Sequence, residues 1–94
     1  MAKATFNGVV IAESDNTVVV DGNHYFPADS IKRDYFSKTD RTTVCSWKGT
    51  ANYYSINVDG KDAPNAAWYY ANPKDKATSI KDHVAFYPTV KVES

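Results

Sequence analysis

The side chains most suited to chemistry gather in one stretch, residues 43–54. Cys45 is the only thiol of the chain, and Trp47 and Lys48 follow it closely. Thiolate is the nucleophilic form of cysteine, and a nearby cation lowers the pKa of the thiol. On a regular strand, however, Cys45 and Trp47 point to one face and Lys48 points to the other. Lys48 therefore lowers the pKa of Cys45 only if Gly49 or a bulge bends the strand back.

Each of these three residues also has a purely structural interpretation. We favour a buried Cys45 that packs as a small hydrophobe, with a normal or raised thiol pKa, over a nucleophile. We expect Trp47 to belong to the core or to a pocket wall rather than to form a stacking platform. Lys48 is either a solvated surface charge or the cation that holds a carboxylate or phosphate of a ligand. Cys45 is the one candidate catalytic residue, and the residue types in this stretch do not identify a reaction.

A second concentration of aromatic side chains lies in residues 66–73, which include Trp68. Asp59-Gly60 is a tight-turn pair, and a hairpin closed there places these rings opposite Tyr53 and its neighbours. Packing alone would explain the rings, but one face of such a hairpin also suits an apolar pocket with a few polar anchors. The candidate ligand-binding residues are then Tyr25, Cys45, Trp47, Lys48, Tyr53 and Trp68.

No metal, cofactor or phosphate-binding motif accompanies these clusters. His24 and His83 are distant in the chain from each other and from Cys45, a spacing that matches no zinc or redox motif. The chain has no glycine-rich phosphate loop, no dinucleotide fingerprint and no nucleophile elbow. The carboxylates are spread over turns, so no acid–base pair can be named. We expect neither a cofactor nor a metal.

Short runs of β-branched and aromatic residues, separated by turn residues, predict the elements that hold these clusters. The predicted strands are residues 5–12, 17–20, 23–26, 42–47, 51–58, 66–71, 84–87 and 89–92. Asp21-Gly22-Asn23 predicts a tight turn between the second and third of them. Pro27 favours a helix over residues 28–36, because proline suits a first helical turn. Residues 37–41 are polar and predict a loop. Residues 77–81 are a candidate for one further helical turn.

Together these elements predict a mainly β fold, a small antiparallel two-sheet sandwich or partly open barrel with one short α-helix near residues 28–36. A parallel sheet would need crossover helices, which the pattern lacks. The chain has 94 residues, which is room for one core, so we expect a single domain over residues 1–94.

Composition excludes several classes of protein. The 11 basic and 11 acidic residues balance, which disfavours nucleic acid as a partner and polybasic attachment to a membrane. One cysteine cannot form an intrachain disulfide. No apolar run is long enough for a signal peptide or a transmembrane helix. We therefore expect a cytoplasmic protein that does not associate with membranes.

Five motifs in this order carry a resemblance to a known family. They are Gly-Val-Val-Ile-Ala-Glu-Ser at 8–14, Tyr-Phe-Pro at 25–27, Thr-Val-Cys-Ser-Trp-Lys-Gly-Thr-Ala-Asn-Tyr at 43–53, Ala-Ala-Trp-Tyr-Tyr at 66–70 with Pro73, and Val-Ala-Phe-Tyr at 84–87. They resemble the bacterial domain-of-unknown-function family numbered 427, from about Phe6 to Val92. One departure is Ser46, where relatives commonly have proline.

The resemblance implies a compact, tent-like β fold with one helix after the Tyr-Phe-Pro motif, and it implies no established activity. Some classifications attach a nucleotidyltransferase-like label to the family. The paired carboxylates that would hold Mg²⁺ and the glycine-rich phosphate loop are both missing from the sequence.

Three functions from different classes are consistent with these observations. The leading hypothesis is a binding domain for a small molecule, catalytic or not, whose ligand is anionic if Lys48 holds it. The alternative is a protein-interaction module or homodimerising scaffold, since exposed aromatic patches serve as interface anchors. The third is binding of single-stranded nucleic acid on a β surface by stacking, which the balanced charge disfavours.

Overall fold

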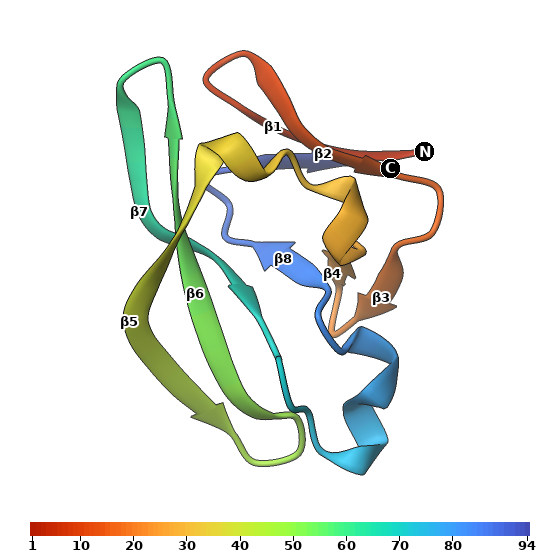
Figure 1. Ribbon diagram of the computed structural model, residues 1–94. Helices are drawn as coiled ribbons and strands as arrows, with labels where there is room; N and C mark the ends of the chain where they lie inside the picture. Colours follow the sequence, from red (N-terminus) through yellow and green to blue (C-terminus); the bar gives the residue numbers. More distant parts are fainter.

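The computed structural model describes residues 1–94, a mainly β chain with nine strands and three short 3₁₀ segments (Figure 1). The strands are β1 (Ala2–Phe6), β2 (Val9–Ser14), β3 (Val18–Val20), β4 (Asn23–Tyr25), β5 (Phe36–Cys45), β6 (Gly49–Val58), β7 (Lys61–Tyr69), β8 (Val84–Phe86) and β9 (Lys91–Glu93). The 3₁₀ segments are η1 (Ala28–Ser30), η2 (Arg33–Tyr35) and η3 (Asp75–Ile80). None of these segments is long and apolar enough to cross a membrane.

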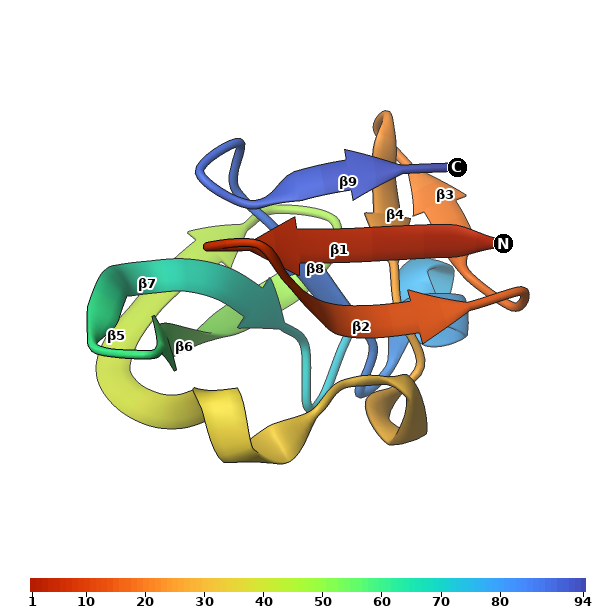
Figure 2. The ribbon, with the colours of Figure 1, turned by 90° about the horizontal axis from the view of Figure 1, so that it is seen from above.

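The strands form three antiparallel sheets, in the orders β2–β1–β9, β3–β4 and β5–β6–β7–β8. Seen from above, β9, β1 and β2 lie side by side, and the two termini lie near each other (Figure 2). The predicted fold class is thereby confirmed: the chain is mainly β and antiparallel, with very little helix and no closed barrel. The sheets number three rather than two.

The first predicted strand, residues 5–12, is wrong because the chain reverses inside it. Asn7 and Gly8 have φ angles of 48° and 79°, as a two-residue hairpin turn between right-twisted strands requires. This turn pairs β1 with β2, and Phe6 lies opposite Val9. The later turns at Asp21-Gly22 and Asp59-Gly60 lie where the sequence predicts them.

The α-helix predicted for residues 28–36 is replaced by η1 and η2. Ile31 between them is extended, with φ −90° and ψ 146°, and it forms a β-bridge with Ala12. The amide of Lys32 donates to the carbonyl of Ile11 at 2.8 Å. Backbone pairing with β2 and burial of Ile31 therefore override a helix signal that rested on few apolar positions. The helical turn expected near residues 77–81 is confirmed as η3.

The loop predicted for residues 37–41 is also wrong, because these polar residues belong to β5. Ser37 pairs with Ser55, and Lys38 pairs with Tyr54. The register then shifts between Lys38 and Thr42, as at a β-bulge. Hydrogen bonding to β6 thus extends a strand through a segment whose composition favours a loop.

Two clusters of buried side chains pack around the β5–β8 sheet. The larger cluster has 16 residues, which include Ile56, and the smaller has 7, which include the fully buried Ile80. Tyr53 belongs to the smaller cluster and Tyr54 to the larger, because successive side chains of a strand point to opposite faces. The strand that carries these tyrosines is therefore packed on both faces.

Candidate functional site

The turn between β5 and β6 brings Cys45, Trp47 and Lys48 together. β5 ends at Cys45, which pairs with Gly49 across the turn, so the alternation of a regular strand does not apply to these residues. Gly49 has a φ of 110°, a conformation that side chains rarely adopt. The backbone N–H of Lys74 donates a hydrogen bond of 2.9 Å to the carbonyl of Lys48 and so stabilises the turn.

Cys45 is half-buried and does not belong to either core cluster. The interpretation of Cys45 as a fully buried hydrophobe is therefore wrong. The backbone N–H groups of Lys48 and then Trp47 stabilise the thiolate, so the pKa of Cys45 is lowered from its ordinary value. The expectation of a normal or raised thiol pKa is wrong, because these backbone N–H groups favour the charged form of the thiol.

Lys48 is neither a solvated charge nor a free cation. It is 8 % exposed, and its Nζ forms an ion pair with Asp21 at 2.7 Å. Burial is the largest single influence and works to lower the pKa of Lys48, but the hydrogen bond to Asp21 and the electrostatic effects of Tyr25, Tyr70 and Asp21 together outweigh it, so the pKa is raised. The pair joins the β5–β6 turn to the β3–β4 turn, so Asp21 already neutralises the charge that we expected to hold an anionic ligand.

Trp47 lies at the surface, 39 % exposed, rather than in the core. The Nζ of Lys48 lies 5.1 Å from the centre of its ring, within cation–π range. Trp47 therefore covers the Lys48 side chain and presents its other surface to solvent.

The cross-strand pairing of the aromatic residues is confirmed, with Tyr53 on β6 opposite Trp68 on β7. Tyr25 packs edge-on to Trp68 and accepts a hydrogen bond from its Nε1 at 3.1 Å. Tyr25 is fully buried and Tyr53 is 4 % exposed. The hydroxyl of Tyr53 lies 2.8 Å from Thr43 Oγ1 and 3.3 Å from the Tyr87 hydroxyl. Tyr25 and Tyr53 therefore support and orient Trp68 and Tyr87 from behind.

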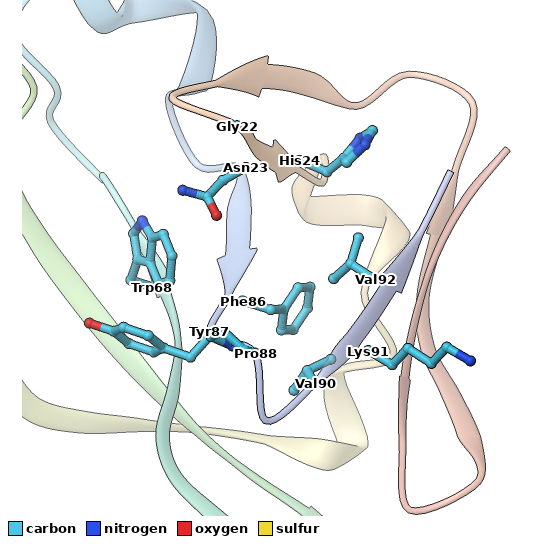
Figure 3. A pocket seen from close by; sticks show the side chains of 10 residues that line it. All are labelled: Gly22, Asn23, His24, Trp68, Phe86, Tyr87, Pro88, Val90, Lys91 and Val92. Atoms are coloured by element: carbon cyan, nitrogen blue, oxygen red, sulfur yellow. The ribbon is translucent and has the colours of Figure 1, made fainter.

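An open cavity of about 560 Å³ lies beside Trp68. Figure 3 shows Trp68 and Tyr87 on one side of it, Val90 and Val92 on the other, and Phe86 between them. The rings of Trp68 and Tyr87 are 4.8 Å apart between centroids.

The polar groups of this cavity come mainly from the start of β4. The amide of Asn23 lies near Trp68, and His24 lies at the upper rim (Figure 3). Thr17 Oγ1 already hydrogen-bonds to Nδ1 of His24 at 2.9 Å. Lys91 points its amine away from the cavity, and its nearest carboxylate is Glu93 at 3.8 Å. The cavity is therefore aromatic and largely uncharged.

Of the six candidate binding residues, Trp68 alone lines this cavity. Sequence reasoning missed Asn23, Phe86 and Tyr87. The signals that could have found them are the aromatic pair directly before Pro88 and the polar residue directly after the Asp21-Gly22 turn, since both positions end or begin a strand at the surface.

The family model described as "Domain of unknown function (DUF427)" matches residues 1–94. The chain belongs to the DUF427 family. The resemblance carried by the five sequence motifs is thus confirmed over the full chain, and the same family model bears the name NTP_transf_9.

The DUF427 description assigns no activity to the chain. No curated protein matches it. In the structure, no three His, Cys, Asp or Glu side chains gather where they could hold a metal ion. The function must therefore be argued from the cavities and side chains of this chain.

Proposed function

We propose that this DUF427 chain binds a small, flat, uncharged molecule in the cavity beside Trp68. The observation that carries the proposal is a space of about 560 Å³ walled by Trp68, Phe86 and Tyr87, which lies within the ~300–1,000 Å³ range of small-molecule sites. Aromatic walls favour a ligand with a planar ring, since stacked or edge-on ring pairs are worth ~0.5–1.5 kcal/mol beyond the burial of their area.

The polar rim supports an uncharged ligand. The Asn23 amide offers both a donor and an acceptor, and no strong charge points into the space. Tyr87 stays neutral as well, because its hydrogen bond with Tyr53, and then burial, raise its pKa. The walls are held in place without a ligand, because Tyr53 and Tyr25 already hydrogen-bond to Tyr87 and Trp68. Such preorganisation lowers the entropic cost of binding.

A screen of aromatic fragments and metabolites, read by thermal shift, tests this proposal. A ligand that binds the native state raises the melting temperature, and Trp68 supplies a fluorescence signal for titration. Tyr87→Ala should abolish the shift. Trp47→Ala is a matched control, because Trp47 and Tyr87 are both 39 % exposed but only Tyr87 lines the cavity. Hits that shift Tyr87→Ala as much as the wild type would refute the proposal.

The β5 edge favours a second candidate function, protein interaction. Val44 is 79 % exposed and lies near the end of the edge strand β5. Trp47, in the turn that follows, is 39 % exposed. Exposed aromatic and aliphatic side chains beside unpaired backbone groups are suited to pairing with another chain. For a scattering test, the reference value for the single chain is its Cα radius of gyration of 12.4 Å, close to the ~12 Å of a compact monomer of this length.

Small-angle scattering across a concentration series tests this candidate. If the β5 edge mediates self-association, the radius rises with concentration, and Val44→Asp reverses the rise. A constant radius would exclude a homodimer in that concentration range.

A further inference from the structure

A second cavity, of about 350 Å³, lies between the segment that holds η1 and η2 and the β6–β7 pair. Tyr69 lines it, whereas its neighbour Trp68 lines the first cavity. Adjacent residues of a strand point to opposite faces, so the two cavities open on different sides of β7. The polar or charged residues of the second cavity are Arg33, Lys38, Asn52, Tyr54, Tyr69 and Asp82.

Tyr54 presents an unused hydroxyl to this cavity. Its side chain is only 7 % exposed, its ring stacks on Tyr69 with centroids 4.6 Å apart, and its hydroxyl has no hydrogen-bond partner in the protein. No fully buried side-chain oxygen or nitrogen lacks a partner, so this hydroxyl is not sealed from solvent, and Tyr54 lines the cavity. The Tyr69 hydroxyl and the Asn52 amide are also without partners. Three residues with neutral, unpartnered polar groups thus line one space.

The charged groups at the rim are predominantly positive. Arg33 and Lys38 are both exposed, and neither belongs to any of the four ion pairs of the structure. Asp82 is the one carboxylate that lines the cavity. Burial, Tyr54 and Asp82 raise the pKa of Tyr69, so its hydroxyl keeps its proton and remains a donor near neutral pH.

We propose that this second cavity binds the phosphate or carboxylate group of a small molecule. Arg33 and Lys38 supply the charge, and the guanidinium of Arg33 can contact two oxygens of either anion. The hydroxyls of Tyr54 and Tyr69 and the amide of Asn52 donate from the deeper part of the cavity. Asp82 opposes a bare anion, and it is placed to accept from a hydroxyl or amine elsewhere on the same ligand. This site is independent of the function proposed for the Trp68 cavity.

Titration with inorganic phosphate and, separately, with acetate at low ionic strength tests the proposal by amide chemical shifts. With at least one of the two anions, the amide chemical shifts of the residues around this cavity should change and reach saturation. The anion that binds more tightly identifies the ligand group as a phosphate or a carboxylate. Arg33→Ala and Lys38→Ala should each weaken binding about ten-fold, in line with the loss of a charged hydrogen bond. Lys76→Ala is the matched control, because Lys76 is exposed and does not line the cavity.

Two further variants separate a built site from simple surface charge. Asp82→Asn should tighten phosphate binding, because it removes the one opposing charge. Tyr54→Phe keeps the buried ring and should weaken binding several-fold with an unchanged melting temperature. The proposal is overturned if neither anion binds saturably, if Lys76→Ala weakens binding as much as Arg33→Ala, or if Tyr54→Phe binds as tightly as the wild type. Tyr87→Ala should leave phosphate binding unchanged, whatever its effect on the Trp68 cavity.

Discussion

At the scale of single residues, the structure changes the chemistry of the Cys45 thiol. The backbone donors of Lys48 and Trp47 lower its pKa, and a lower pKa means more thiolate at a given pH. The rate of alkylation by iodoacetamide should therefore reach half its maximum below pH 9.0, the ordinary value for the thiol. The chain unfolded in guanidinium is the control and should show the ordinary midpoint. Identical midpoints in the folded and unfolded chains would contradict this prediction.

The ion pair between Lys48 and Asp21 is the second residue-scale feature with a measurable consequence. Asp21→Asn leaves a nearly buried ammonium without its partner, so the free energy of unfolding at pH 7 should fall by about 1–2 kcal/mol, a value discounted for the exposure of Asp21. Because the pKa of Lys48 is raised from 10.5, the stabilisation is complete below pH 10.5. It is lost as the pH rises through the folded-state pKa.

Urea denaturation of the wild type and Asp21→Asn at pH 7 and above pH 11 measures this difference. The gap between the two proteins should narrow at the higher pH. Glu13→Gln is a matched control, because it breaks a 3.5 Å pair between Lys3 and Glu13 in which both side chains are well exposed. Its effect should stay under about 0.5 kcal/mol. An equal loss of unfolding free energy in the two variants would show that the burial of Lys48 adds nothing to the strength of its ion pair with Asp21.

At the scale of elements, the β5–β6 turn depends on Gly49. A Cβ at this position would make only ordinary van der Waals contact, at 3.5 Å, with Asn72 O and Lys74 N, but the φ of 110° is strained for any side chain. Gly49→Ala should therefore cost about 2 kcal/mol of stability. It should also return the alkylation midpoint of Cys45 toward the ordinary value, because the backbone donors move.

Gly8→Ala is the matched control for the turn. Gly8 also has a positive φ, of 79°, but a Cβ there would meet nothing within 4 Å. Gly8→Ala should lower the free energy of unfolding by about 1 kcal/mol and should leave the alkylation midpoint of Cys45 unchanged. Chemical denaturation and the alkylation profile measure both quantities, and equal behaviour of the two glycine variants would count against the special role of Gly49.

At the scale of the whole molecule, the two core clusters share the β5–β8 sheet. Ile56 and Ile80 are both fully buried, one in each cluster. Ile56→Val and Ile80→Val should each lower the free energy of unfolding by about 0.5–1.5 kcal/mol. Because both clusters depend on the same strands, unfolding should remain one transition in each variant. Tryptophan fluorescence and far-ultraviolet circular dichroism should give the same midpoint, and separated midpoints would show that the clusters unfold independently.

The amino-acid sequence by itself determined the local features of this protein. Short runs of β-branched and aromatic residues, the turn pairs Asp21-Gly22 and Asp59-Gly60, and the scarcity of helix signals predict a mainly β antiparallel fold, because these preferences act between near neighbours. The motifs also identified the DUF427 family, which the family model confirms. Asn7-Gly8 is also a turn-forming pair, but apolar residues continue beyond it, so the pattern favours one continuous strand over residues 5–12.

Only the tertiary structure decided the features that depend on distant residues. The helix predicted for residues 28–36 is lost because β2 pairs with Ile31. Lys48 is neutralised because a turn far from it in the chain supplies Asp21. The cavity beside Trp68 is made with Tyr87, and the cavity beside Tyr69 with Arg33. Such contacts depend on the path of the whole backbone, whereas the spacing of residues along one strand specifies only the face to which each side chain points.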